Sequence, residues 1–380
     1  MPIRAAIITT GFSKDENDYG GASAFHNFVR ELSENKEIDV TVFAFYYPVN
    51  QPEYNFYNAK VFSFASGKTD SILSKLKTWR KCEKKFIEEH AKNKFDLIHS
   101  MWARESGFVA SRLSRKLNIP FIANIGGGEL GDLKEINYGS RASQLQKYFV
   151  DKTFARTDAI ISGSDYITEK INKYYGAIIS SKVHKLPFGV DEKMFSSQNI
   201  NINDNNLPVL INVANAVPVK SHETLFKAVK IVSEKYPGII LECYGRDDKN
   251  VLDNLAKECE ISKNVHLKGL IDYENIPGIF NKKSIFVLSS LYESQNMSLI
   301  EAAFCGVPVV STNVGVAGEI TGNIVEAGNP EQLSEKIIYA IENYQEEKQK
   351  ALEKRESIIN KYSLKKTTED FVRLYKTIVL

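Results

Sequence analysis

Short β-branched runs alternate with amphipathic stretches along this chain, and this alternation limits its possible folds more than any other feature. The runs in the first half are AAIITT (5–10), VTVFAFYY (40–47), FDLIHS (95–100), PFIANI (120–125) and AIISGS (159–164), and helical patterns separate them, the first near 22–35. Strands that alternate with helices in this way are typical of a parallel, doubly wound α/β sheet. We therefore predict a Rossmann-like domain in the first half.

The alternation begins again at PVLINVA (208–214) and continues through IILECYG, VHLKG, SIFVLSS and PVVST. A chain of 380 residues is also too long for one ordinary core. The segment between the halves is rich in Asn, Asp and Ser. We predict a first domain at 1–195, a linker or hinge at 196–207, a second Rossmann-like domain at 208–360 and a C-terminal helical segment at 361–380. Ligands of such sheets lie at the carboxyl ends of the strands.

Composition excludes several classes of protein. The net charge of +2 argues against a dedicated nucleic-acid binder, and there is no run of about 18 apolar residues that would cross a membrane. The apolar start MPIRAAIITTGFS is typical of a buried strand rather than a signal peptide. Four cysteines without a CxxC pair favour reduced thiols, a cytoplasmic location and no metal site.

Two glycine- or lysine-bearing loops are candidates for ligand contact. Gly20 and Gly21 precede a helix and let the backbone approach a ligand, although the nicotinamide fingerprint GxGxxG is absent. Lys220 lies between a buried strand and a helix, where a cation can meet a diphosphate. The simpler alternatives are a structural turn and a solvated lysine.

Residues 284–310 carry a stronger signal. The run SIFVLSS predicts a buried strand, and a helix is expected from about Ser298 to Cys305. Glu293 would lie on the loop before this helix and Glu301 in its first turns, where carboxylates can accept hydrogen bonds from sugar hydroxyls. The N–H groups at the start of the helix favour a phosphate. The alternative is that both glutamates are ordinary surface charges.

With these motifs the chain resembles the retaining glycosyltransferases of family 4, which are GT-B enzymes of the glycosyl transferases group 1. The resemblance rests on two glutamates with seven residues between them and a Gly-x-Pro-Val turn, and it extends over nearly the whole chain. The matching positions are Glu293, Glu301, Ala302, Gly306, Pro308, Val309, GVAGEI (315–320), GGASAFHNFVREL (20–32), LPFGVDEKMF (186–195), Lys220 and the tail after Tyr362.

The resemblance implies two Rossmann-like domains that face a cleft and a C-terminal helix that crosses back to the first domain. It also implies a nucleotide-diphospho-sugar donor, with no metal or other cofactor. By family position, Glu301 would hold the ribose hydroxyls, Glu293 would position the transferred hexose without acting as a nucleophile, and Lys220 would neutralise the diphosphate. The backbone at Asn296, Met297 and Ser298 would assist, and Gly20 and Gly21 would approach the phosphates from the first domain.

Two positions depart from the family pattern. Asn215 stands where an arginine is frequent and is still expected on the donor-binding side, and Ile125 stands where a histidine is frequent. By sequence, Arg246 and Arg104 are the candidates to replace the missing cation. In GGGELGD (126–132), Gly126 and Gly127 would permit close approach of an acceptor or donor sugar and Glu129 would bind a hydroxyl; the alternative is a flexible turn.

Residues 71–90 predict a basic amphipathic helix. Ile72, Leu73, Leu76, Trp79 and Phe86 share a broad apolar face beside several lysines. Such a helix fits docking on an anionic membrane surface, which would make the protein peripheral on the inner face of the plasma membrane. The alternative is a solvated helix whose apolar stripe packs on the sheet.

Together these features predict a cytoplasmic hexosyltransferase that acts on a glycan or lipid-linked acceptor in bacterial surface polysaccharide synthesis. A catalytically silent partner subunit and a nucleotide-sugar epimerase stay open as alternatives, and a two-lobed solute-binding protein is the least favoured. The residues do not indicate the donor base, the sugar, the acceptor, the linkage or the oligomeric state.

Overall fold

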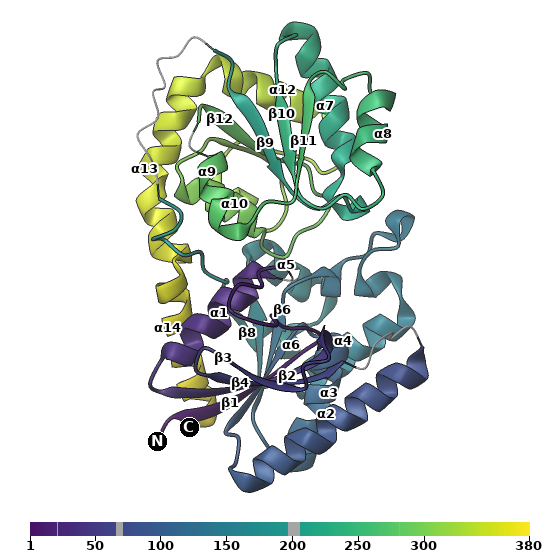
Figure 1. Ribbon diagram of the computed structural model, residues 1–380, viewed down its shortest axis with the longest axis vertical. Coiled ribbons are helices and arrows are strands. Elements are labelled where there is room, and N and C mark those ends of the chain that lie inside the picture. The colour runs from purple at the N-terminus through teal and green to yellow at the C-terminus, as the bar shows by residue number, and fades with distance from the viewer. Residues whose placement is uncertain (21, 66–70, 197–205, 281) are drawn as a thin grey trace. The chain divides into compact units, whose positions relative to one another are not determined.

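The chain folds into two compact units in a computed structural model that describes residues 1–380 apart from 21, 66–70, 197–205 and 281. Unit 1 contains Met1–Gly189 and Leu364–Leu380, and unit 2 contains Val190–Ser363 (Figure 1). The sequence-based domain limits stood at 195 and 360, and most of the predicted hinge at 196–207 lies outside the described residues.

Unit 1 is built on an eight-stranded sheet with the order β3-β4-β2-β1-β5-β6-β7-β8. All neighbouring strands run parallel except the β3–β4 pair at one edge. Its strands are β1 (Ile3–Thr9), β2 (Ile38–Val49), β3 (Glu53–Phe56), β4 (Ala59–Ala65), β5 (Leu97–Met101), β6 (Phe121–Ile125), β7 (Ala159–Ser162) and β8 (Val183–Lys185). Its α-helices are α1 (Ser23–Glu34), α2 (Ile72–Lys92), α3 (Glu105–Leu117), α4 (Gln144–Arg156), α5 (Asp165–Tyr174), α6 (Ala177–Ser180) and α14 (Leu364–Val379), and short 3-10 turns cover Gly128–Leu130, Lys134–Ile136 and Ser140–Ala142.

The C-terminal helix α14 belongs to the core of unit 1. The ring of Phe371 on α14 packs against the ring of Phe28 on α1, with 4.6 Å between the ring centroids, so α14 lies beside α1 (Figure 1). Tyr375 is fully buried, and its hydroxyl lies 2.5 Å from Nδ1 of His99 on β5. The helical spacing of the last residues is therefore confirmed, and so is the predicted return of this helix to the first domain.

Unit 2 is built on a six-stranded, all-parallel sheet with the order β11-β10-β9-β12-β13-β14. Its strands are β9 (Val209–Val213), β10 (Leu241–Tyr244), β11 (Val265–Gly269), β12 (Ser284–Leu288), β13 (Val309–Thr312) and β14 (Ile324–Val325). Its α-helices are α7 (His222–Lys235), α8 (Val251–Glu258), α9 (Ile276–Ile279), α10 (Met297–Phe304), α11 (Ala317–Ile320), α12 (Pro330–Glu342) and α13 (Tyr344–Tyr362), with 3-10 turns at Pro218–Lys220 and Tyr273–Asn275. Helices α7, α8 and α12 share one apolar core with the sheet. The prediction of two Rossmann-like α/β domains is confirmed.

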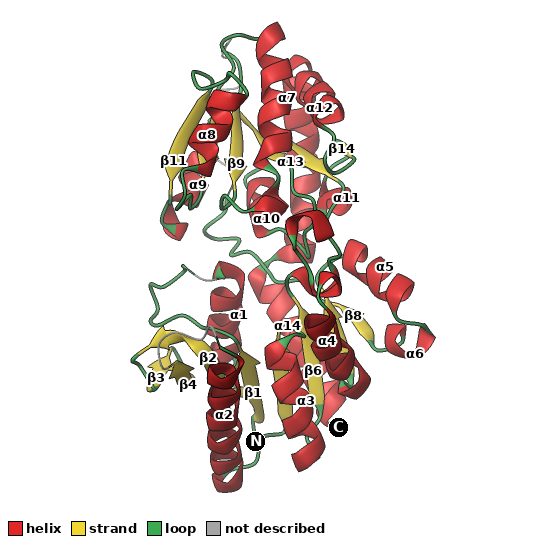
Figure 2. Cartoon of the chain, turned by 90° about the vertical axis from the view of Figure 1, so that its right-hand side faces the viewer, coloured by secondary structure: helices red, strands yellow, loops and turns green. Residues whose placement is uncertain are grey.

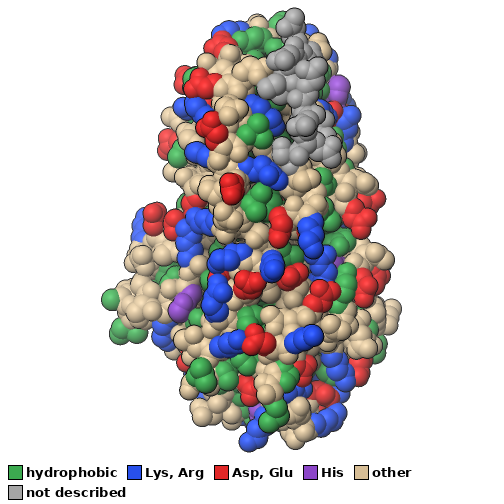
Figure 3. Space-filling model, turned by 90° about the vertical axis from the view of Figure 1, so that its left-hand side faces the viewer, with side chains coloured by type: hydrophobic (Ala, Val, Ile, Leu, Met, Phe, Trp, Pro, Cys, Tyr) green, Lys and Arg blue, Asp and Glu red, His purple; other side chains and the backbone are tan. Residues whose placement is uncertain are grey.

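The outer faces of α13 and α14 carry basic and acidic side chains side by side (Figure 3). Ion pairs such as Lys366–Asp370 and Lys376–Glu37 account for this mixture. Among the described helices, none is long and apolar enough to cross a bilayer.

The predicted basic helix forms as α2, but its apolar face is divided. Trp79 and Phe86 are buried in the core of unit 1, as the packing alternative requires. Ile72 and Leu73 instead remain 68% and 72% exposed. The five apolar residues therefore differ in burial, because only the later turns of α2 reach the sheet.

Candidate active site

A carboxylate of unit 2 gathers three hydrogen-bond donors at the carboxyl edge of the sheet. The Oε1 atom of Glu293 accepts from the Lys220 ammonium at 2.6 Å, from the Ser290 hydroxyl at 2.7 Å and from the Asn296 amide at 3.0 Å. Lys220 lies in the turn after β9, and Glu293 lies in the loop after β12. Only 11% of the Glu293 side chain is exposed, so this ion pair is partly shielded from water.

Two hydrogen bonds to backbone carbonyls also join the two loops. The Ser289 hydroxyl donates to the carbonyl of Lys220 at 2.9 Å, and the Leu291 N–H donates to the carbonyl of Val219 at 2.8 Å. These bonds fix Lys220 relative to the end of β12. A preorganised cation of this kind needs little rearrangement to meet an anionic ligand.

Asn296 both begins α10 and contacts the carboxylate. Its backbone has φ +79°, and its Oδ1 atom accepts from the Leu299 N–H at 2.8 Å, while its Nδ2 atom donates to Glu293. This side-chain cap satisfies one N–H group of the first turn. The N–H groups of Met297 and Ser298 begin the helix at its positive end, which favours an anion.

Gly315 holds the loop before α10 in place from the other side. A Cβ atom at this position would lie 2.5 Å from the carbonyl oxygen of Gln295 and 3.0 Å from Cβ of Glu293, and φ is +58°. The adjacent Val316 N–H donates to the same Gln295 carbonyl at 3.0 Å. The close approach explains why a small-residue loop follows β13.

Glu301 lies on α10 and is only 2% exposed. Burial raises the pKa of its carboxyl to about 7, and a hydrogen bond from Tyr273 opposes part of this rise. The reading of Glu301 as a surface charge is therefore wrong. The structure brings the two predicted glutamates, Lys220 and the start of α10 into one region of unit 2, and it adds Ser290 and Tyr273. Sequence reasoning did not single out these two; the serine pair that ends SIFVLSS was the signal for Ser290.

Asn215 shapes the neighbouring loop after β10. Its Oδ1 atom accepts from the Arg246 N–H at 2.9 Å, and the Arg246 carbonyl accepts from the Ala216 N–H at 2.8 Å. Arg246 also lines a pocket of about 360 Å³ beyond the ends of β10 and β11, together with Gly245 and Asp247. The asparagine at this position therefore holds the loop that carries the candidate replacement cation.

The predicted sugar-side residues lie in unit 1. Gly20 donates its N–H to Asp18 at 3.2 Å, and Gly21 lies outside the described residues. Glu129 is 1% exposed, and its two carboxylate oxygens accept from the N–H groups of Ala103, at 3.2 Å, and Gly127, at 2.8 Å. In this structure the Glu129 carboxylate thus joins the loops after β5 and β6.

An aromatic residue that sequence reasoning passed over stands beside these glycines. Trp102 follows β5 with φ +68°, which is rare for a bulky residue. A Cβ atom at Gly126 would lie 3.2 Å from the indole nitrogen, and one at Gly127 would lie 3.5 Å from the ring. The indole is partly exposed at the carboxyl edge of the sheet. Such strained residues cluster at functional sites.

Sequence comparison assigns both units to one group of enzymes. Residues 194–360 match the glycosyl transferases group 1, and residues 19–193 match glycosyltransferase family 4. The chain belongs to glycosyltransferase family 4. This glycosyltransferase is 27% identical to an uncharacterised glycosyltransferase of Methanocaldococcus jannaschii, over 74% of this chain and 75% of that one.

Solved structures share the fold of this glycosyltransferase. The sucrose-phosphate synthase of Thermosynechococcus elongatus superposes with a TM-score of 0.82 and 18% identity, over 99% of both chains. Anabaena HepE, solved in complex with UDP-glucose, superposes with a TM-score of 0.74 and 15% identity, over 99% of this chain and 100% of that chain.

Proposed function

We propose that this glycosyltransferase moves a hexose-type sugar from a nucleotide-diphospho-sugar onto a glycan or lipid-linked acceptor, with retention at the anomeric carbon. The observation that carries the proposal is the Lys220–Glu293–Asn296 cluster at the start of α10, next to the buried Glu301. The complex of Anabaena HepE with UDP-glucose supports this class of donor.

In the proposed reaction the bond between the anomeric carbon and the diphosphate breaks, and negative charge develops on the leaving phosphate. Lys220 and the N–H groups of Met297 and Ser298 stabilise that charge, which needs no metal. Removing one such positioned group typically slows catalysis by about 10²–10³-fold. The acceptor oxygen bonds to the anomeric carbon on the face that the diphosphate leaves, while the departing phosphate oxygen takes the proton of that hydroxyl, and this front-face route gives retention.

Glu293 and Glu301 position the donor in this proposal. The three donors on Glu293 fix its carboxylate, which accepts a hydrogen bond from a hydroxyl of the transferred sugar. Glu301 accepts from the ribose hydroxyls. The pocket beside Arg246 and Gly245 then receives the base, because it lies beyond the next strands of the same sheet.

A donor panel tests this assignment. Purified protein is mixed with nucleotide sugars that differ in base and sugar, and thermal stabilisation and nucleotide release are measured for wild type, Lys220→Met and Lys227→Met. Lys227 is the matched control, because it is an exposed lysine of α7 paired with Glu223. We expect one donor to stabilise the wild type and the control but not Lys220→Met, and proton NMR of the product to show a retained anomeric configuration.

Other outcomes separate the alternatives. A new nucleotide sugar formed without any acceptor would indicate an epimerase. Stabilisation without nucleotide release under any acceptor would indicate a silent subunit, and stabilisation that survives in Lys220→Met would remove the proposed diphosphate site.

We also propose that Trp102 forms an acceptor platform in unit 1. A partly exposed indole offers an apolar face to a sugar ring, and the glycines at 126 and 127 leave room beside it. Acceptor glycans should therefore change the fluorescence of Trp102, whereas the only other tryptophan of the chain, Trp79, is buried. A signal that persists in Trp102→Phe would contradict the platform.

A membrane contact at the start of α2 brings the enzyme to the proposed lipid-linked acceptor. Helix α2 lies on the outside of unit 1 (Figure 2). Ile72 and Leu73 are exposed there, and Lys77, Arg80 and Lys81 are exposed and have no carboxylate partner among the described residues. Apolar side chains beside unpaired cations suit an anionic bilayer. Ile72→Ser/Leu73→Ser should abolish co-sedimentation with phosphatidylglycerol vesicles, and equal binding to phosphatidylcholine would refute the electrostatic part.

A further inference from the structure

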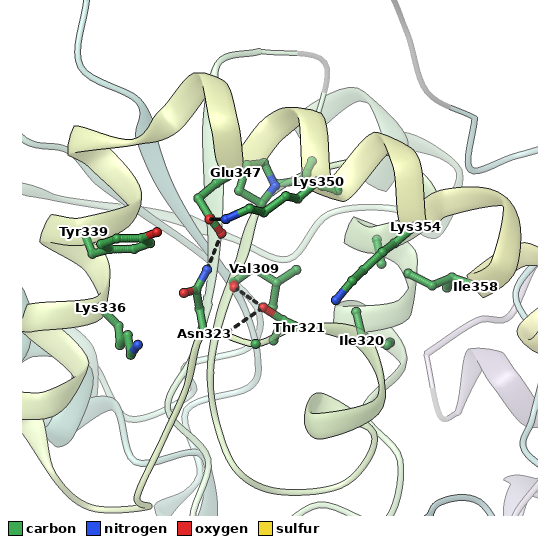
Figure 4. A pocket seen from close by; sticks show the side chains of 15 residues that line it. Val309, Ile320, Thr321, Asn323, Lys336, Tyr339, Glu347, Lys350, Lys354 and Ile358 are labelled. Carbon is green, nitrogen blue, oxygen red and sulfur yellow. Dashed lines mark hydrogen bonds and ion pairs between the residues drawn. The ribbon is translucent and has the colours of Figure 1, made fainter.

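Unit 2 contains a second pocket, of about 300 Å³, at the edge of the sheet opposite the candidate active site (Figure 4). It lies beside Val309, where β13 begins, and beside Thr321–Asn323, just before β14. The active-site loops instead follow the carboxyl ends of β9 and β12. The pocket is therefore separate from the Lys220–Glu293 cluster.

One wall of the pocket is apolar, and the polar groups of the other wall are hydrogen-bonded to one another. Val307, Pro308, Ile320, Ala351 and Ile358 are among its apolar lining residues. On the polar side, the Thr321 hydroxyl donates to the Val309 carbonyl at 2.9 Å and accepts from the Asn323 N–H at 3.0 Å. These mutual bonds keep the wall in one shape, which favours a preformed binding site.

Part of the polar network also fixes one of the pocket's lysines. The carboxylate of Glu347 accepts from the Asn323 side chain, and its other oxygen lies 2.9 Å from the Lys350 ammonium. Lys350 pairs with Glu346 as well, at 2.7 Å, and these two carboxylates raise its pKa. Lys350 is therefore committed to carboxylates of its own helix.

Two further lysines of the lining have no carboxylate partner in the described part of the chain, and the ammonium of Lys336 lies 5.8 Å from the centroid of the Tyr339 ring. Lys336 reaches the pocket from α12 and Lys354 reaches it from α13, on opposite sides of the space (Figure 4). Neither ammonium lies within ion-pair distance of a carboxylate in the described part of the chain. The lining thus contains three ammonium groups and a single carboxylate, that of Glu347.

We propose that this pocket is a second binding site, for a small organic anion that is distinct from the sugar donor. Its phosphate or carboxylate group accepts a charge-assisted hydrogen bond from Lys354, which lies on the same side of the space as Ile320 and Ile358, and Lys336 adds positive charge on the other side (Figure 4). Its apolar body packs against Pro308, Ile320 and Ile358. The volume lies at the lower end of the range for small-molecule sites, so the ligand is smaller than a nucleotide sugar.

Phenyl phosphate is a suitable probe, because it combines an anionic head with a small apolar body. Phenol supplies the body alone and inorganic phosphate supplies the head alone. Binding is measured by saturation-transfer NMR titration with the full chain. We expect phenyl phosphate to bind about tenfold more tightly than either fragment, since both parts of the site contribute.

Four variants locate the binding. Gly322 lines the pocket and a Cβ atom there would meet nothing within 4 Å, so Gly322→Leu adds an apolar side chain at the pocket and should abolish binding. Lys336→Gln/Lys354→Gln should weaken binding about tenfold. Lys263→Gln removes the charge of an exposed lysine elsewhere in unit 2 and should change nothing. Lys220→Met should also change nothing, because the phosphate does not bind at the donor site.

Melting curves of each variant verify folding, and if Gly322→Leu does not fold, the lysine pair carries the test alone. Absence of binding to wild type would overturn the proposal. Equal binding by Gly322→Leu would do the same, and so would loss of binding in Lys220→Met, because it would place the phosphate at the donor site.

Discussion

Replacing Glu301 by Gln should stabilise unit 2 at high pH and should do so much less at low pH. The folded carboxyl has a pKa of about 7 because it is buried, whereas the ordinary value is 4.5. Unfolded chains therefore lose this proton at lower pH than folded chains, and the stability of unit 2 falls as pH rises from about 4.5 to 7. At 1.36 kcal/mol for each pKa unit, the ionisation costs the wild type about 3 kcal/mol above pH 7.

A glutamine at 301 cannot ionise, so the variant escapes this cost. Its amide adds its own hydrogen-bonding change, but that change is the same at every pH and cancels in the difference between pH 5 and pH 8. The unfolding free energy of Glu301→Gln minus that of wild type should therefore increase by about 2.5 kcal/mol between these two values, because part of the cost is already present at pH 5.

Pulsed thiol labelling in urea, with mass spectrometry, reads the two units separately. Cys243 is buried in unit 2 and Cys82 is buried in unit 1. The midpoint for Cys243 should shift between pH 5 and pH 8 in the wild type more than in Glu301→Gln, while the Cys82 midpoint should respond equally in both. Glu335→Gln, at an exposed position of α12, is the control substitution. Identical pH dependence in Glu301→Gln and wild type would refute the reasoning.

Three other predictions concern the loops and the returning helix. Lys220→Met should lower kcat/KM for nucleotide release by about 10²–10³-fold, and an equal loss in Lys227→Met would contradict its special role. Gly315→Ala should lower the free energy of unfolding of unit 2, measured by labelling of Cys243, by about 2 kcal/mol or more, because φ is +58° and the added Cβ meets the Gln295 carbonyl. The control Gly278→Ala has open space around its Cβ and should stay within about 0.5 kcal/mol of wild type. Tyr375→Phe removes the buried hydrogen bond to His99 and should lower the free energy of unfolding of unit 1, measured at Cys82, by about 1 to 2 kcal/mol, with no change for unit 2, measured at Cys243. A shift at both cysteines would show that α14 stabilises more than unit 1.

The sequence predicts the fold well where a residue pattern repeats. The alternation of strands and helices, the start of α10 near Ser298 and the returning C-terminal helix all follow from periodicity and from the family resemblance. The strands β3 and β4 escape prediction, because a short hairpin at a sheet edge leaves only a brief pattern.

The candidate site is predictable in its residue types but not in its contacts. The spacing of Glu293 and Glu301 identifies both, yet it does not show that Ser290 and Asn296 converge on one oxygen of Glu293. Local spacing also does not predict the hydrogen bonds of the Glu129 carboxylate, because its two backbone partners lie in different loops. A helical pattern also does not show which turns of α2 reach the sheet and which stay exposed.

The two places where the chain passes between the units lie side by side. The Val190 N–H donates to the Tyr362 carbonyl at 2.9 Å, and the Cα atom of Leu364 would lie 2.4 Å from a Cβ atom at Gly189. Unit 2 is therefore a domain inserted into unit 1 between Gly189 and Leu364. If Gly189 were joined to Leu364 through a few flexible residues, unit 1 alone would keep every strand of its sheet and its last helix, α14. Replacing unit 2 by a homologous domain would therefore cut no strand or helix of unit 1.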